Sequence, residues 1–290
     1  MTSQPDKLRA LLAQDTCYVM PCCYDGLSAK MIAQADFPLT FMSGFAVSAA
    51  RLGLPDTGLI SYGEMLDQAR NICAAVDIPV IGDGDTGYGN ALNIKRTING
   101  YARAGMAAIM IEDQLAPKRC GHTKGKAVVD REEAFDRIKA AVDARNEGDD
   151  ILILARTDAR ASLGMDEAIM RAQKFSELGA DILFVEAPEN EDEMTTICRE
   201  VPGIHMANMV EGGTTPLLAP DRLEEIGYRI IAYPLTVMSA AMSNMRAALN
   251  ELKSGTHPET RLMSFEDLRE IVGFNDYYEE ESRYSNPRTD

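Results

Sequence analysis

The chain has 290 residues, of which 46% are hydrophobic and 26% charged, a composition typical of a globular protein that buries a full core. Its net charge of -16 excludes a general affinity for nucleic acid or anionic membranes, because both are bound mainly through an excess of Lys and Arg. No apolar run reaches the roughly 20 residues that cross a bilayer, and the N-terminus is polar, so we expect a cytoplasmic protein.

Short apolar segments alternate with amphipathic ones along the chain. The apolar segments predict eight strands, at 17–21, 39–43, 79–83, 108–112, 151–157, 182–186, 205–208 and 229–233. Between them, apolar residues recur at three- and four-residue spacing and predict helices, for example at 61–76, 90–104, 131–146 and 166–178. Regular βα alternation implies a parallel sheet with right-handed crossovers, and eight units in this length close into a barrel.

We therefore expect one (β/α)8 TIM-barrel domain over residues 1–290, with the barrel at about 17–253 and a helical tail at about 254–290. A doubly wound dinucleotide-binding sheet is the alternative, but no G-x-G-x-x-G follows the first strand, and Gly82-Asp83-Gly84-Asp85 has carboxylates where a pyrophosphate would lie. A helix at 235–253 and a second amphipathic segment at 264–271 exceed what eight units require. We expect this tail either to pack on a neighbouring subunit or to close over the barrel.

Polar residues end several of the predicted strands, and in a barrel these ends converge on one face. Asp83 and Asp85 lie two apart in a glycine-rich run, with Glu112 at the end of the next strand and Asp56 in Leu54-Pro55-Asp56. Hard oxygen donors without nearby histidines suit Mg²⁺ or Mn²⁺ and disfavour zinc. The alternative for the aspartate pair is a solvated Asx-turn that caps the next helix.

A reactive loop is predicted at Lys118-Arg119-Cys120-Gly121-His122. Cationic neighbours favour the thiolate and lower the pKa of a cysteine, which fits Cys120 for proton transfer near neutral pH. The alternative is a basic surface loop with an incidental cysteine, and His122 has the alternative role of packing the loop. The other five cysteines are expected to be reduced, buried residues.

Several motifs together carry a family resemblance. They are 43–56 (SGFAVSAARLGLPD), 82–90 (GDGDTGYGN), 111–114 (IEDQ), 118–122 (KRCGH), 155–158 (ARTD), 207–209 (ANM) and 215–217 (TPL). In this order, from about Cys17 to about Lys253, they resemble the isocitrate lyase and phosphoenolpyruvate mutase superfamily. The resemblance implies a (β/α)8 barrel that forms a homotetramer, a dimer of dimers, with a C-terminal helix exchanged between paired subunits.

The resemblance also implies roles for individual residues. Asp83 would bind Mg²⁺ directly, while Asp56, Asp85 and Glu112 reach the ion largely through water. The carboxylate of a 2-oxo or 2-hydroxy acid would be bound by Ser43, the backbone amides of Gly44 and Phe45, and Arg156. Glu186, which we count with the catalytic residues, and Asn208 would line the same pocket. The loop residues Lys118, Arg119, Gly121 and His122 would close it.

The Cys120 loop is similar to that of the carbon–carbon lyases of the superfamily and differs from that of the phosphonate mutases. Cys120 would act as the general acid, with His122 poising the thiol. Phe41 and Phe45 depart from the methylisocitrate lyase pattern: Phe41 cannot serve as a tyrosine base, and Phe45 makes the pocket more apolar. We therefore expect a lyase that releases pyruvate from a 2-alkylmalate such as 2,3-dimethylmalate, with 2-methylisocitrate next.

Two other functions remain open. The same barrel could decarboxylate or hydrolyse oxaloacetate, or act on a phosphonopyruvate-type substrate. A barrel that binds dicarboxylates without catalysis is a hypothesis of another class. It is disfavoured because buried carboxylates and an arginine at a barrel mouth cost stability unless a ligand compensates them.

Overall fold

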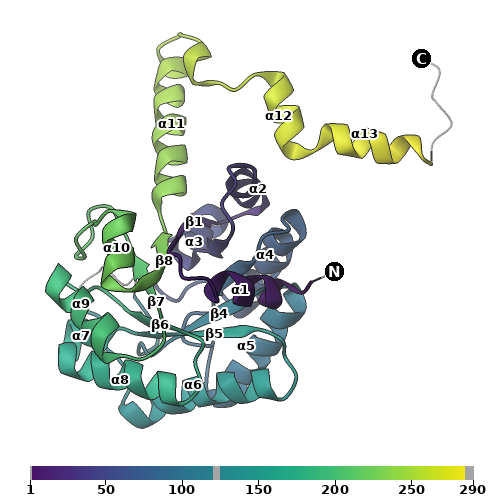
Figure 1. The fold of residues 1–290 in the computed structure, drawn as a ribbon. Helices are drawn as coiled ribbons and strands as arrows, with labels where there is room; N and C mark the ends of the chain where they lie inside the picture. Colours follow the sequence, from purple (N-terminus) through teal and green to yellow (C-terminus); the bar gives the residue numbers. More distant parts are fainter. Residues whose placement is uncertain (1, 120–124, 285–290) are drawn as a thin grey trace. The chain divides into compact units, whose positions relative to one another are not determined.

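The computed structural model describes residues 2–119 and 125–284. Its eight parallel strands pair in chain order and close into a barrel (Figure 1). They are β1 (Tyr18–Cys23), β2 (Thr40–Met42), β3 (Val80–Asp83), β4 (Ala108–Glu112), β5 (Leu152–Thr157), β6 (Ile182–Val185), β7 (Ile204–Asn208) and β8 (Tyr228–Tyr233). β8 returns to β1 with Ile230 opposite Tyr18, so no strand is left with a free edge. The predicted (β/α)8 fold is confirmed.

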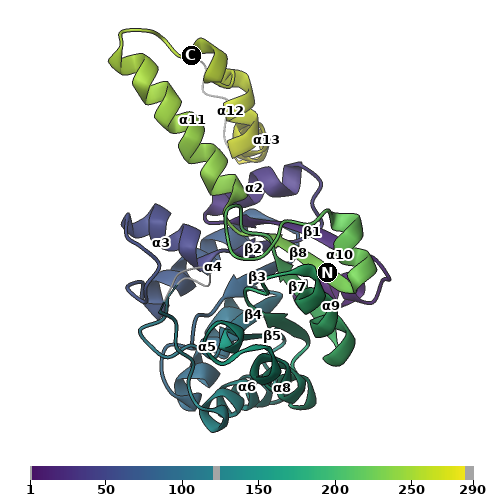
Figure 2. The same cartoon turned by 90° about the vertical axis from the view of Figure 1, so that its left-hand side faces the viewer.

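Helices lie outside the barrel strands (Figure 2). They are α2 (Gly26–Gln34), α3 (Gly44–Leu52), α4 (Tyr62–Ala75), α5 (Ala91–Ala104), α6 (Arg131–Asn146), α7 (Ala159–Leu163), α8 (Met165–Glu177), α9 (Glu191–Glu200) and α10 (Pro220–Ile226). Side-chain caps fix where several begin. Ser61 and Glu64 form a capping box at α4, and Asn90 with Asn93 forms one at α5.

The hydrophobic core has two main layers. Side chains inside the barrel, such as Met20, Leu39 and Ile81, form a cluster that also contains Leu8 of helix α1 (Gln4–Leu12). A larger cluster lies between the strands and the outer helices and includes Phe175 of α8. The barrel interior is therefore packed with side chains, and the strand ends are left to carry polar groups. Within the described residues, no helix is both long and apolar enough to span a membrane.

The chain divides into two compact units, Met1–Met238 and Ser239–Asp290. The second contains most of α11 (Thr236–Lys253), a 3-10 turn (Glu259–Arg261), α12 (Phe265–Val272) and α13 (Phe274–Ser282). No described residue of α12 or α13 is buried. The helices predicted at 235–253 and 264–271 are present. The assignment of residues 1–290 to a single domain stays a prediction.

Candidate active site

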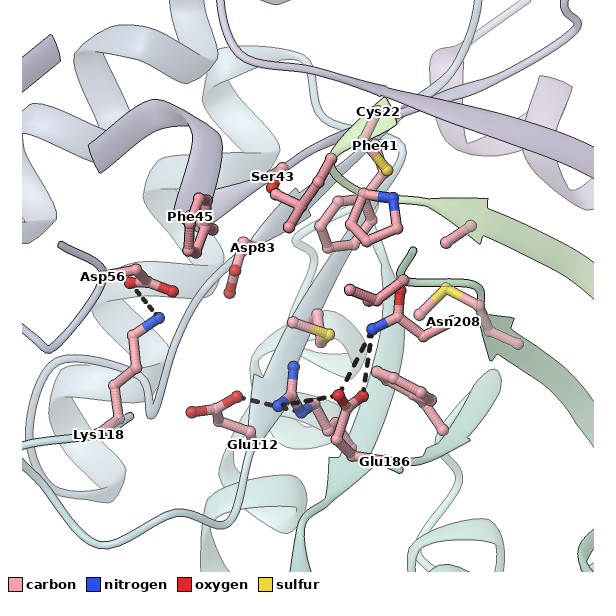
Figure 3. A pocket seen from close by; sticks show the side chains of 18 of the residues that line it. Cys22, Phe41, Ser43, Phe45, Asp56, Asp83, Glu112, Lys118, Glu186 and Asn208 are labelled. Atoms are coloured by element: carbon pink, nitrogen blue, oxygen red, sulfur yellow. Dashed lines mark hydrogen bonds and ion pairs between the residues drawn. The ribbon is translucent and has the colours of Figure 1, made fainter. Parts of the chain in front are cut away.

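A pocket at the carboxyl ends of the strands has a volume of about 630 Å³, part of which is open to solvent (Figure 3). Its polar lining comes from six strands or the loops after them: Ser43, Asp56, Asp83, Glu112, Lys118, Arg119, Arg156, Glu186 and Asn208. Its apolar lining is Cys22, Phe41, Phe45, Met110, Phe184, Met206, Val210, Ala232, Pro234 and Leu235. The fold thus brings most of the predicted site residues to one place. Cys120, Gly121 and His122 lie outside the described residues.

The turn after β3 holds two of the predicted metal-binding aspartates. The Asp85 amide donates to Asp83 Oδ1 (3.0 Å), and Asp85 lies in the left-handed region with φ 48°. The Asp85 carbonyl accepts from the Glu112 amide at 2.9 Å, which brings the ends of β3 and β4 together. A Cβ on Gly84 would lie 2.6 Å from the Met110 carbonyl oxygen, so only glycine permits this close approach.

Asp83 lies at the N-terminus of α3. The Gly44 amide donates to Asp83 Oδ2 at 3.2 Å, while the Ser43 hydroxyl caps the helix by accepting from the Ala46 amide. Both oxygens of Asp83 are therefore oriented by backbone N–H groups, and the helix terminus favours an anion there. Burial, reinforced by the Asp85 charge, nevertheless raises the pKa of Asp83 to about 6. The Gly44 amide, predicted to bind substrate, contacts this carboxylate.

Lys118 lies among the carboxylates. Its Nζ is 2.5 Å from Asp56 Oδ1 and 2.7 Å from Asp85 Oδ1, and the residue is buried. Burial alone would lower the pKa of Lys118, but Asp85, Asp83 and Asp56 outweigh it and raise that pKa well above its usual value. The ammonium is therefore charged and balances part of the acidic cluster.

Arg156 provides the second buried cation. β4 and β5 pair so that it lies opposite Glu112, and its Nε is 3.2 Å from Glu112 Oε2. Asp158 holds the guanidinium through two hydrogen bonds, from Nε (2.8 Å) and Nη2 (3.0 Å). Asp158 precedes α7 yet makes no side-chain cap, because its carboxylate turns to Arg156 and to Lys126 Nζ (3.0 Å).

A buried hydrogen-bond network around Asp113 holds the chain next to this arginine. Asp113 accepts from the Asp158 amide (2.9 Å), and its other oxygen accepts from the Thr157 hydroxyl (2.7 Å) and from Arg171 (3.0 Å). All of these groups are buried. The network fixes the backbone at the end of β5, so Arg156 is presented to the pocket in one orientation.

Glu186 and Asn208 complete the wall beyond Arg156. Asn208 Nδ2 lies 3.4 Å from Glu186 Oε2, and Glu186 Oε1 lies 4.0 Å from Arg156 Nη2. The Glu186 amide donates to the Thr157 carbonyl (3.0 Å), and this hydrogen bond joins the chain just after β6 to the end of β5. Figure 3 shows Asn208 directed toward Glu186, and the distance from Glu186 to Arg156 makes both predicted residues neighbours of the guanidinium.

The donor set fits a hard divalent cation. Asp56 Oδ1, Asp85 Oδ1 and Glu112 Oε1 are buried; the first two face only the Lys118 ammonium, and Glu112 Oε1 accepts no hydrogen bond from any described residue. Buried oxygens of this kind are costly unless a cation or water compensates them. In the described part of the chain, no three acidic, histidine or cysteine side chains are close enough to bind one ion together. Carboxylate oxygens are the ligands that Mg²⁺ prefers, and it usually keeps several waters and binds only one or two carboxylates directly.

Sequence reasoning assigned no role to three residues that organise the site, although two of them, Gln114 and Asp158, lie in the motifs that carry the resemblance. Asp158 lies two residues after Arg156 at a strand end, and that place could have indicated its contact with the guanidinium. Lys126 gives no local signal, because its partner lies 32 residues away. Gln114 binds the backbone of Arg119 at both its amide and carbonyl, through Oε1 (2.9 Å) and Nε2 (2.8 Å), and so fixes the start of the loop.

The barrel and its strand-end cluster of carboxylates and buried cations define a class of (β/α)8 enzymes that act on small carboxylic acids. The family model "Phosphoenolpyruvate phosphomutase" matches residues 8–253. The chain belongs to this family, within the phosphoenolpyruvate mutase/isocitrate lyase superfamily. It is 42% identical to the 2,3-dimethylmalate lyase of Eubacterium barkeri, over 97% of this chain and 98% of that protein.

Three solved structures carry the same fold over nearly the whole chain. A 2,3-dimethylmalate lyase is 34% identical with a TM-score of 0.94, covering 100% of this chain and 98% of that one. An oxaloacetate acetylhydrolase with 3,3-difluorooxalacetate is 33% identical with a TM-score of 0.94, covering 99% of each. A phosphonopyruvate hydrolase with oxalate and Mg²⁺ is 30% identical with a TM-score of 0.86, covering 98% of this chain and 99% of that one.

Proposed function

We propose that the protein is a Mg²⁺-dependent carbon–carbon lyase that cleaves a 2-alkylmalate, with 2,3-dimethylmalate as the favoured substrate, to pyruvate and a second carboxylic acid. The observation that carries this is a single pocket that brings together a buried guanidinium, a carboxylate cluster and several apolar side chains. A 2-alkylmalate has matching parts: two carboxylates, a hydroxyl group and alkyl substituents. Similarity to the dimethylmalate lyases supports the same substrate class.

Asp83 is the proposed direct ligand of the ion, with Asp56, Asp85 and Glu112 holding its waters. When bound, Mg²⁺ supplies positive charge for the carboxylate and hydroxyl oxygens of a 2-hydroxy acid. Arg156 binds a substrate carboxylate, and Asp158 keeps its guanidinium in that orientation. Ser43 and the N-terminus of α3 complete the polar end, while Phe45 and Phe184 exclude water beside the reacting carbons.

Two proton movements balance the cleavage. The hydroxyl proton leaves to a pocket carboxylate. Glu112 is the proposed acceptor, because its Oε1 accepts no hydrogen bond from the described residues. The bond between C2 and C3 breaks, C2 becomes the keto carbon of pyruvate, and the electron pair on C3 takes a proton from Cys120. Glu186 and Asn208 position the substrate. By resemblance to the family, Lys118, Arg119 and Gly121 are proposed to bind it and His122 to poise the thiol.

A screen for pyruvate release tests this function. Purified protein is incubated with 2,3-dimethylmalate, 2-methylisocitrate, isocitrate, oxaloacetate and phosphonopyruvate, each with Mg²⁺ and with EDTA, and pyruvate, oxalate, acetate and phosphate are assayed. The highest rate is expected with 2,3-dimethylmalate and Mg²⁺. If oxaloacetate is the only compound turned over, giving oxalate and acetate, the protein is a hydrolase and not a lyase. This is the second candidate function, because the chain is similar to oxaloacetate acetylhydrolase.

The assembly is proposed to be a homotetramer, a dimer of dimers in which the C-terminal helices pack on another copy of the chain. Large apolar side chains on these helices are exposed, including Met242, Met245, Leu249 and Leu252 of α11. They recur at alternating steps of three and four residues, which is the spacing of one helical stripe. Such a stripe is the expected contact surface for a second copy.

A further inference from the structure

Lys118 occupies an unusual position for a residue expected to bind substrate. Its side chain reaches back to Asp56 rather than into the open pocket, as Figure 3 shows. Its Nζ lies 2.5 Å from Asp56 Oδ1 and 2.7 Å from Asp85 Oδ1. Only 5% of the residue is exposed. The ammonium is thus placed inside the acidic cluster that is proposed to hold the metal ion.

The two oxygens that Lys118 contacts are the same ones left without a hydrogen bond from the described residues. A divalent ion or its bound waters would use these oxygens too. An ammonium this close to both leaves no room for such a water and repels a second cation. Lys118 and the metal ion are therefore alternative counter-ions for one set of carboxylates.

We propose that Lys118 is the built-in counter-ion of the metal-free site, and that binding of a divalent ion releases its side chain into the pocket to meet the anionic substrate. Without metal, the ammonium neutralises carboxylates that would otherwise be buried and unpaired. With metal, the released ammonium adds positive charge beside Arg156, where a dicarboxylate must bind. Metal binding consequently precedes substrate binding. This inference rests on the proposed Mg²⁺ dependence.

The backbone allows the exchange without rearrangement. Gln114 holds the Arg119 amide and carbonyl by two hydrogen bonds, and a Cβ on Gly58 would lie 3.5 Å from the Lys118 amide, which shows how closely the two segments pack. The anchor at residue 119 is independent of the Lys118 side chain. A change of rotamer along its four-carbon stem is therefore enough to move the ammonium.

Amine labelling of the wild-type protein tests the exchange directly. The metal-free protein and the protein saturated with Mg²⁺, both without substrate, are treated briefly with an acetylating reagent, and each lysine is quantified by mass spectrometry. Labelling of Lys118 is expected to rise about tenfold with Mg²⁺, the factor for losing ion pairs worth about 1.4 kcal/mol. Lys126, whose partner Asp158 lies outside the metal cluster, should not change. Equal labelling of Lys118 in both states would overturn the inference.

Calorimetric titration of Mg²⁺ into variants provides an independent test. Lys118→Met is expected to bind Mg²⁺ about tenfold more tightly than the wild type, because no ammonium competes. Lys118→Arg keeps the charge and should bind no more tightly than the wild type, and Lys126→Met should match it. Unchanged or weaker binding by Lys118→Met would contradict the inference. If Lys118→Met does not fold, the wild-type labelling decides alone.

The two proposals fail in different ways. A wild-type protein that binds no divalent ion would overturn both the Mg²⁺ dependence and the exchange. A wild-type protein that binds Mg²⁺ and releases pyruvate, but labels Lys118 equally in both states, would overturn only the exchange.

Discussion

The orientation of one guanidinium decides how the pocket can bind an acid. Arg156 contacts two carboxylates besides Asp158, and only Asp158 binds it through two hydrogen bonds. Lys126 in turn balances the charge of Asp158, so part of the positive charge of Arg156 stays available to a substrate. Asp158 is therefore a positioning residue: it sets where Arg156 points.

Replacing Asp158 by Asn should weaken substrate binding while leaving metal binding unchanged. The amide keeps the shape but loses the charge and one acceptor, so Arg156 is no longer held at both nitrogens. The loss of charge-assisted bonds worth about 1.5–3 kcal/mol predicts a rise in KM by about tenfold or more. Steady-state kinetics and Mg²⁺ titration measure this, with the exposed Asp150→Asn as control. A lower melting temperature with unchanged KM would reduce Asp158 to a structural role.

At the residue scale, sequence reasoning reached the groups that end strands and missed those that act across loops. Asp83, Glu112 and Arg156 follow or end apolar runs, and parallel strands bring such ends together. The pairing of Lys118 with Asp56 joins positions 62 residues apart in two separate loops. No periodicity or local motif encodes such a contact, because it depends on how the loops pack.

At the scale of elements, the N-terminus of α3 and the turn after β3 form one unit. Gly44 begins the helix and donates to Asp83 Oδ2, and a Cβ at Gly44 would lie 2.4 Å from that same oxygen. The helix can therefore approach the aspartate only because residue 44 has no side chain. This contact links helix packing to the geometry of the proposed metal ligand.

Gly44→Ala should displace Asp83 and weaken Mg²⁺ binding by about tenfold or more, because the carboxylate must move to relieve the contact. Gly63→Ala is the matched control: it also lies in the first turn of a helix, and its Cβ would meet nothing closer than 3.9 Å. That variant should bind Mg²⁺ as the wild type does. Equal Mg²⁺ affinities for both variants in calorimetry would show that the helix terminus does not position Asp83.

His205 gives β7 a pH-dependent stability. It is buried, its Nε2 lies 2.8 Å from the Val201 carbonyl oxygen, and burial lowers its pKa. Since the folded state disfavours the protonated ring, its contribution is present above the unfolded pKa of about 6.5 and is lost as the pH falls below it.

The variant His205→Gln can still donate to Val201 but does not titrate. We expect it to be about 1 kcal/mol less stable than the wild type at pH 8, with a smaller difference at pH 5. Thermal unfolding of both proteins at the two pH values measures this. A difference in melting temperature that is the same at pH 8 and pH 5 would contradict the assignment.

The strands were predictable because barrel strands are buried on both faces and appear as short apolar runs. All eight predicted runs overlap strands of the structure, with shifts at the ends: the first was predicted at 17–21 and is observed as Tyr18–Cys23. The boundary moved because Cys22 pairs with Phe41 of β2, a contact between strands that the local pattern does not show.

At the scale of the whole molecule, the exposed apolar stripe of α11 predicts association. A tetramer of a 31.7 kDa chain has a mass of about 127 kDa. The double variant Leu249→Lys with Leu252→Lys places two charges in the stripe and should shift the mass toward the dimer or monomer in light scattering. Ser243→Lys, on the same helix outside the stripe, should leave the mass unchanged. A monomeric wild-type protein would contradict the tetramer.

The most direct test of the proposed lyase follows both products and the proton in one reaction. 2,3-Dimethylmalate is incubated with the protein and Mg²⁺ in D₂O, and the products are identified by NMR. Cleavage between C2 and C3 predicts equal amounts of pyruvate and propionate, one deuterium at C2 of the propionate, and no reaction in EDTA. Absence of pyruvate, or product formation at the same rate in EDTA, would contradict a Mg²⁺-dependent carbon–carbon lyase.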